Sequence, residues 1–191
     1  MTNTALNPAS PLVVDTAELG RSVGATMRVE REVPAPGALG LGVYQVPESS
    51  PLSLDLILTA VSEGVLADGD VVADAEGECA RCLAPIEDTL RVRVQELYAY
   101  EGSVTEETTD ADEVLRLQGD LLDLEPAVRD ALVLAMPVTP LCRPDCPGLC
   151  AECGVPWDEL PDDHRHETVD PRWSALEKLR SVDVEGDDRP E

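Results

Sequence analysis

The stretch LSLDLILTA, residues 52–60, decides the fold class because its leucines recur with a period of two. Successive side chains of a β-strand point to opposite faces of a sheet, so this alternation predicts a strand with one buried face. The buried face is expected to carry Leu52, Leu54, Leu56 and Leu58, and the other face Ser53, Asp55 and Ile57. The stretch is therefore typical of a half-buried strand in an antiparallel sheet.

Segments on both sides repeat this pattern. TLRVRVQEL, residues 89–97, is expected to turn Leu90, Val92 and Val94 inward and Arg91, Arg93 and Gln95 outward. TMRVEREV, residues 26–33, alternates more weakly, and Gly and Pro at 34–42 and 64–69 are expected to supply turns. Because no helical segments alternate with these strands, an antiparallel sheet or small barrel is the expected packing.

A helical pattern follows in DLLDLEPAVRDALVLAM, residues 120–136, where apolar side chains recur every three or four positions. Those positions are Leu121, Leu124, Val128, Ala131, Leu132 and Ala135. We expect a helix over 121–135, ended by Pro137. A second, short helix is expected in DPRWSALEKL, residues 170–179, which begins with an Asp-Pro pair suited to a helix N-terminus.

These elements predict an α+β fold: mainly an antiparallel β-sheet or small barrel, followed by a helix, a cysteine-rich zinc knuckle and a short C-terminal helix. The expected organisation has four parts. They are a flexible N-terminus at 1–11, a β-rich body at 12–136 with an acidic loop at 101–113 and the helix at 121–135, a cysteine-rich lobe with the C-terminal helix at 137–180, and an acidic tail at 181–191.

The charge balance restricts the partners. The chain has 14 Lys and Arg against 39 Asp and Glu, which gives a net charge of −25 at pH 7. Acidic runs often do no more than solubilise a chain, but they also repel nucleic acid and attract basic proteins. Binding to a phosphate backbone requires many Lys and Arg side chains. We therefore expect no DNA partner. Direct RNA contact stays open for a local basic face, because Arg91 and Arg93 share one side of a predicted strand, and Arg81 and Arg143 both neighbour cysteines that could converge.

No segment approaches the roughly 20 apolar residues that span a bilayer, and the first residues lack the basic and apolar regions of a secretory signal. We expect a soluble, cytoplasmic protein without a membrane partner. A reducing compartment makes closely spaced cysteines more typical of metal sites than of disulfides.

The stretch CRPDCPGLCAEC, residues 142–153, places four cysteines within twelve positions. The predicted metal ligands are Cys142, Cys146, Cys150 and Cys153. Tetrahedral Zn²⁺ needs two chain reversals that face each other, and the intervening Pro147-Gly148 pair permits such a reversal. A structural Zn²⁺ is the expected cofactor. Disulfides, an iron–sulfur cluster with the CxxxCxxC spacing of 146–153, and unligated thiols are the alternatives.

A second cysteine pair stands at Cys79 and Cys82, within predicted strands rather than at the helix N-terminus that thioredoxin-like chemistry needs. The pair is either an ordinary reduced turn, a second source of ligands that completes or shares the metal site, or a redox pair. His164 and His166 are either surface residues of an acidic loop or replacements for a distant thiol ligand.

Catalytic motifs are missing from the sequence: it has no phosphate-binding glycine loop and no nucleophile elbow. The assembled motifs do resemble the YceD family of large ribosomal RNA subunit accumulation proteins, in the form typical of high-GC Gram-positive bacteria. The resemblance is carried by GECARCL at 77–83, DLLDLEPAVRDALVLAMPVTPLC at 120–142, CRPDCPGLCAECG at 142–154 and the closing DPRWSALEKL.

The resemblance implies a bacterial ribosome biogenesis factor that supports 23S rRNA accumulation and large-subunit assembly, with no established enzymatic activity. Combined with the net charge, it suggests a partner among the basic large-subunit ribosomal proteins or an assembly intermediate. The alternative function is a metal- or thiol-dependent enzyme or redox sensor that uses Cys79 and Cys82.

Overall fold

The computed structural model describes residues 6–40, 42–103 and 114–166. The chain divides into two compact units, Met1–Cys146 and Pro147–Glu191. The sequence placed the start of the cysteine-rich lobe earlier, at 137. The predicted C-terminal helix and the acidic tail lie outside the described residues, as does most of the predicted acidic loop.

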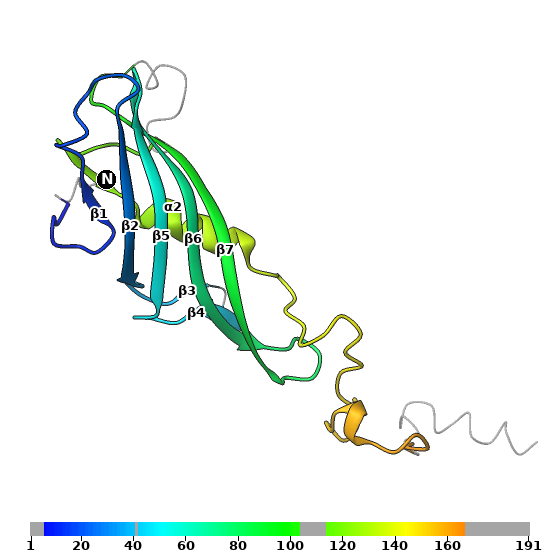
Figure 1. The fold of residues 1–191 in the computed structure, drawn as a ribbon. Coiled ribbons are helices and arrows are strands. Elements are labelled where there is room, and N and C mark those ends of the chain that lie inside the picture. Colours follow the sequence, from blue (N-terminus) through cyan, green and yellow to red (C-terminus); the bar gives the residue numbers. More distant parts are fainter. Residues whose placement is uncertain (1–5, 41, 104–113, 167–191) are drawn as a thin grey trace, which may run out of the picture. The chain divides into compact units, whose positions relative to one another are not determined.

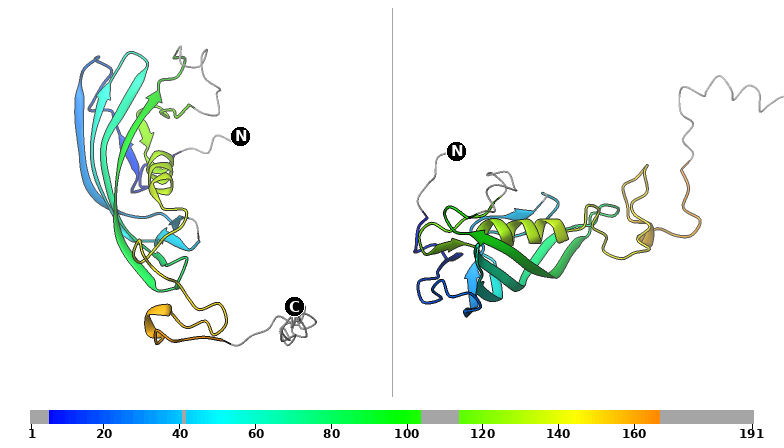
Figure 2. Two further views of the ribbon diagram at one scale, coloured as in Figure 1. Left: turned by 90° about the vertical axis from the view of Figure 1, so that its right-hand side faces the viewer. Right: turned by 90° about the horizontal axis from the view of Figure 1, so that it is seen from above.

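The first unit is built on one antiparallel sheet (Figure 1). Its strands are β2 (Thr26–Pro34), β3 (Leu39–Gly40), β4 (Tyr44–Val46), β5 (Pro51–Ala60), β6 (Gly64–Glu78) and β7 (Pro85–Ala99). β6 is central: β5 and β4 pair with successive parts of one edge, and β7 pairs with the whole of the other edge. β2 pairs with β5, and β3 pairs with β4. The sheet curves into a half-barrel rather than a closed barrel, since no pairing joins β2 to β7 among the described residues (Figure 2).

The alternation in 52–60 is confirmed. Leu52, Leu54, Leu56 and Leu58 are at most 1% exposed, whereas Ile57 between them is 50% exposed. Val92 and Val94 of β7 are buried, and Arg91 and Arg93 are exposed, as the sequence predicted. One face of the sheet therefore forms the core, and the other is a polar surface.

The predicted turn at 64–69 is wrong, because these residues begin β6. The chain reverses just before them, where the Val61 N–H donates to the Gly64 carbonyl at 2.9 Å. Gly64 and Gly69 serve a different purpose: a Cβ at either position would collide with the backbone oxygen of Tyr98 or Asp55 on a neighbouring strand. Glycine here permits close strand packing and does not mark a turn.

The helix predicted at 121–135 begins later, as α2 (Glu125–Ala135). The preceding residues form β8 (Leu121–Asp123), which pairs with β1 (Val13–Asp15). Leu122 and Leu124 are both fully buried, two positions apart, which is the spacing of a strand and not of a helix. α2 packs against β7 and β3 on the concave side of the sheet (Figure 2), and thereby closes the core.

The second unit contains one short 3-10 helix, η1 (Trp157–Glu159), within its described part. No helix in the described part of the chain combines the length and apolar character needed to cross a bilayer.

Candidate metal centres

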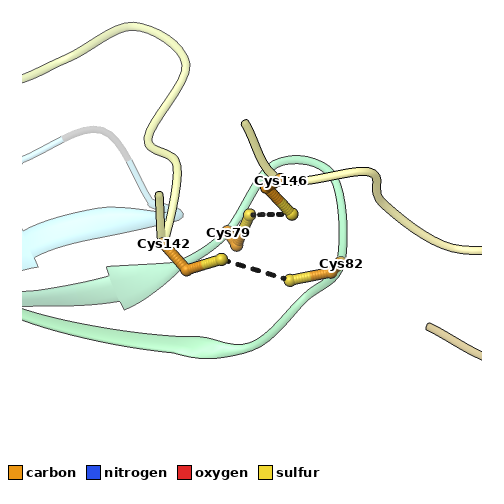
Figure 3. A group of neighbouring side chains, drawn as sticks. All are labelled: Cys79, Cys82, Cys142 and Cys146. Atoms are coloured by element: carbon orange, nitrogen blue, oxygen red, sulfur yellow. Dashed lines mark hydrogen bonds between the residues drawn. The ribbon is translucent and has the colours of Figure 1, made fainter. Parts of the chain in front are cut away.

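Four thiols of the first unit come together at one end of the sheet (Figure 3). Cys79 directly follows β6, and Cys82 lies in the turn that joins β6 to β7. Cys142 and Cys146 lie in the loop after α2. We call these residues the four-cysteine group.

The sulfur positions of the four-cysteine group fit one tetrahedral ion. Cys79 Sγ lies 3.8 Å from Cys146 Sγ, and Cys82 Sγ lies 3.6 Å from Cys142 Sγ. A tetrahedral ion with metal–sulfur bonds of about 2.3 Å separates its sulfur ligands by about 3.8 Å. A disulfide needs only about 2.05 Å, and all six cysteines of the chain are free thiols. The group can therefore hold a metal ion with four thiolate ligands.

Electrostatics around the group favour a bound cation. Backbone N–H groups, first that of Cys142 and then those of Cys82 and Arg81, face the Cys79 sulfur and lower the pKa of this thiol to about 6. Desolvation, followed by hydrogen bonds with the three neighbouring thiols, raises the pKa of Cys142 to about 12. One thiolate is thus stabilised by the protein alone, whereas several thiolates this close together require a cation.

The Cys79–Cys82 turn has the hydrogen bonds of a tight knuckle. The Cys79 N–H donates to the Ala84 carbonyl at 2.8 Å, and the Leu83 N–H donates to the Cys79 carbonyl at 2.9 Å. Leu83 has a positive φ of 61°, which is uncommon for a residue with a side chain. Arg81 extends from this turn and donates from Nη1 to the Cys146 carbonyl at 2.8 Å. The turn therefore fixes two candidate ligands and, through Arg81, contacts the loop that carries the other two.

The buried position of Cys79, 0% exposed, suits a ligand better than a reactive thiol, because a redox or nucleophilic sulfur must be reached by its substrate. Cys79 and Cys82 also lie at a strand end and in a turn, and not at the helix N-terminus that thioredoxin-like chemistry needs.

A second group of candidate ligands lies in the second unit: Cys150, Cys153, His164 and His166. We call it the Cys2His2 group. Its four ligand atoms lie within 4.8 Å of one another. Backbone N–H groups, first that of Cys153 and then that of Glu152, lower the pKa of the Cys150 thiol to about 6.

The four cysteines predicted to share one ion are divided between these two groups. Cys142 and Cys146 are grouped with Cys79 and Cys82, whereas Cys150 and Cys153 are grouped with His164 and His166. Sequence reasoning raised both additional pairs only as alternatives. The sequence did contain one signal, because each CxxC pair supplies two candidate ligands and needs two more from elsewhere. The spacing within 142–153 instead favoured a single site made of the four neighbouring cysteines.

Comparisons with known proteins agree with the sequence motifs. The family model described as large ribosomal RNA subunit accumulation protein YceD matches residues 67–180, a range that includes every candidate ligand. The YceD family is not known as an enzyme family. No solved structure matches the chain.

Curated relatives match most of the chain. An uncharacterized protein of Mycobacterium tuberculosis is 47% identical over 171 residues, which cover 90% of this chain and 82% of the relative. An uncharacterized protein of Mycobacterium leprae is 39% identical over 175 residues, with 92% and 80% covered. The uncharacterized protein YlbN of Bacillus subtilis is 28% identical over 108 residues, with 56% and 61% covered. The family match spans more than half of the sequence, and the chain belongs to the YceD family, whose description supports a role in ribosome biogenesis.

Proposed function

We propose that this chain is a non-enzymatic ribosome biogenesis factor of the bacterial cytoplasm that supports 23S rRNA accumulation by binding a basic protein of the large subunit. The observation that carries the proposal is the match to a family described by large ribosomal RNA subunit accumulation. The protein partner, as opposed to RNA, is inferred from the distribution of charge over the described residues.

An acidic groove on β6 and β7 supports a basic partner. Two adjoining hollows share Glu76 and Glu87, and none of the described residues that line them is Lys or Arg. The carboxylates along the groove are Asp74, Glu76, Glu78, Glu87 and Asp88. Such a surface attracts Lys and Arg side chains and raises the rate of association with a positively charged protein.

Like charges face each other inside this groove. Glu76 of β6 is directly opposite Glu87 of β7, and both residues are exposed. Directly opposed like charges destabilise a strand pair, so a Lys or Arg placed between them relieves this repulsion. Asp88 is held in position, because its Oδ2 accepts a hydrogen bond from the Tyr44 hydroxyl at 3.0 Å.

The arginines on the exposed face of the sheet argue against RNA as the main partner. Arg28 is bidentate to Asp55, with both contacts at 3.0 Å. Arg93 is bidentate to Asp68 at 2.9 and 2.7 Å, and Arg91 lies 3.5 Å from Asp70. Each such pair is neutral overall. A phosphate would have to compete with a carboxylate for each guanidinium, and the face offers little positive potential.

We also propose that the ion of the four-cysteine group is Zn²⁺ with a structural role. Four thiolates in a tetrahedron favour Zn²⁺ among divalent metals, and four protein ligands leave no open position for substrate. An ion there would join the β6–β7 turn to the loop after α2. The metal would stabilise this end of the sheet and perform no reaction.

Depletion in a bacterium that carries this chain tests the cellular role. We expect less 23S than 16S rRNA and fewer mature large subunits, and we expect a plasmid-borne copy to restore both. Affinity capture from the same cells should retain basic large-subunit proteins. An unchanged ratio of 23S to 16S rRNA after depletion would refute the role in large-subunit accumulation.

The groove is tested by removing charge without changing side-chain shape. Glu76→Gln with Glu87→Gln should weaken binding to basic large-subunit proteins, and the wild-type affinity should fall as salt rises beyond about 0.15 M, where exposed charges are screened over about 8 Å. The matched control, Glu18→Gln with Glu101→Gln, removes the same charge from exposed positions outside the groove. An equal loss of affinity in both variants would mean that net charge, and not the groove, attracts the partner.

A further inference from the structure

We propose that Cys150, Cys153, His164 and His166 form a second, independent Zn²⁺ site, so that the chain binds two zinc ions and the second ion organises the second unit. This site is distinct from the four-cysteine group, and the inference does not depend on the ribosomal role.

The first support is that both CxxC segments fold into the same knuckle. In CARCLA, residues 79–84, the Cys79 N–H donates to the Ala84 carbonyl, and the Leu83 N–H donates to the Cys79 carbonyl. CAECGV, residues 150–155, has the same two bonds, from the Cys150 N–H to the Val155 carbonyl and from the Gly154 N–H to the Cys150 carbonyl, both at 2.8 Å.

The backbone conformation repeats as well. The residue that follows each CxxC has a positive φ, 61° at Leu83 and 71° at Gly154. At Gly154 this conformation carries no steric cost, because glycine lacks a Cβ. Cys150 and Cys153 therefore lie in a turn with the same geometry as the Cys79–Cys82 turn, which presents two candidate ligands of the four-cysteine group.

The second support is the position of the imidazoles. Cys153 Sγ lies 3.6 Å from His164 Nε2. A tetrahedral zinc with Zn–S of about 2.3 Å and Zn–N of about 2.1 Å separates a sulfur from a nitrogen by about 3.6 Å. The His164 and His166 rings are 4.4 Å apart between centroids and nearly perpendicular, at 84°, and all four ligand atoms fall within 4.8 Å of one another.

Trp157 helps to orient the ligands. Its ring packs edge to face on His164 at 5.6 Å between centroids, and its backbone N–H donates to the Gly148 carbonyl at 3.0 Å. Trp157 therefore links the segment before Cys150 to the histidine segment. Contacts that fix the orientation of a ligand are a common feature of metal sites in proteins.

The third support is that the described part of the second unit has few buried residues. Among its described residues, Pro147–His166, the only buried ones are Gly148 and Cys150. A segment this short cannot be stabilised by a hydrophobic core and usually requires a metal or a disulfide. The thiols here are free, so a metal ion is the stabilising group that fits the residues present.

Metal analysis of the full chain, purified without a polyhistidine tag and without added zinc, tests the proposal. We expect two zinc ions per wild-type chain and one in His164→Ala. His164→Cys should retain two, because a thiolate can replace the imidazole as a ligand. Arg165→Ala is the matched control, since this exposed residue lies between the two histidines, and it should retain two ions.

Cobalt substitution identifies the ligands of each site. Cys79→Ser with Cys82→Ser disables the four-cysteine group, and the remaining Co²⁺ should show a tetrahedral spectrum with two thiolates. In His164→Ala with His166→Ala, the remaining Co²⁺ should have four thiolate ligands. Its thiolate charge-transfer band should be about twice as intense as in Cys79→Ser with Cys82→Ser, because that band grows with the number of sulfur ligands.

One zinc per wild-type chain, or two zinc ions in wild-type protein whose two histidines are both free of metal by NMR, would overturn the proposal. Circular dichroism separates loss of metal from loss of fold, because the strands that dominate the spectrum belong to the first unit. A β-sheet signal that is retained in His164→Ala while one zinc is lost would support the independence of the two sites.

Discussion

At the scale of single residues, Leu56 and Ile57 show how one position along a strand changes the environment completely. They are adjacent in β5, but Leu56 is 0% exposed and Ile57 is 50% exposed. Both side chains are aliphatic and have the same number of carbon atoms. Their difference in burial therefore comes from the alternation of the strand and not from their chemistry.

We predict that Leu56→Ala lowers the free energy of unfolding by about 2–5 kcal/mol, because it removes buried methyl groups and leaves a cavity in the core. Ile57→Ala serves as the matched control and should change the free energy by about 1 kcal/mol or less. Urea unfolding followed by circular dichroism measures both. A similar loss in the two variants would contradict the assignment of faces in β5.

At the scale of elements, the four-cysteine group depends on two segments that meet from different parts of the chain. The β6–β7 turn provides Cys79 and Cys82, and the loop after α2 provides Cys142 and Cys146. Besides the contacts of the thiols themselves, hydrogen bonds join the segments: the Ala80 N–H donates to the Pro140 carbonyl at 2.8 Å, and Arg81 donates to the Cys146 carbonyl.

We predict that Arg81→Ala weakens metal binding by the four-cysteine group about 10-fold, since removal of a contact that positions a ligand typically costs 10- to 100-fold in affinity. Competition with a chromophoric chelator measures the affinity. Arg91→Ala is the control, because Arg91 contacts Asp70 on the exposed face of the sheet and should leave metal affinity unchanged. An equal effect of both substitutions would indicate that positive charge in general, and not the bond to Cys146, supports the ion.

At the scale of the whole molecule, charge is the dominant property. The net charge of −25 opposes the approach of nucleic acid and favours basic proteins. Arg28 of β2 is paired with Asp55, and Arg91 and Arg93 of β7 are paired with Asp70 and Asp68. The part of the local basic face that consists of Arg91 and Arg93 is therefore electrostatically compensated.

We predict that Arg91→Ala with Arg93→Ala leaves the weak affinity for 23S rRNA fragments unchanged at about 0.15 M salt, since these guanidinium groups are already paired with carboxylates. Parallel titrations with RNA fragments and with a basic large-subunit protein, each across a salt series, measure the two affinities. Tight RNA binding that is lost in this variant would overturn the protein-partner proposal and leave an RNA-contacting one.

The sequence by itself determined the local features of this protein. The period of two in 52–60 and 89–97 identified the strands and their buried faces, because strand geometry acts between neighbouring residues. The helical spacing identified α2, although not the strand β8 before it. The glycines at 64–69 were misread as a turn, because the same residue also permits close contact between strands, and only the position of the neighbouring strands distinguishes the two uses.

Only the tertiary structure decided which candidate ligands lie together. Cys79 and Cys82 are about sixty residues from Cys142 and Cys146 in the sequence, and they meet because the loop after α2 reaches the β6–β7 turn (Figure 1). Spacing within 142–153 favoured one ion for four neighbouring cysteines, since a local pattern contains no information about distant partners. The physical reason is that a tetrahedral ion selects ligands by distance in space, and the folding of the sheet and helix sets that distance.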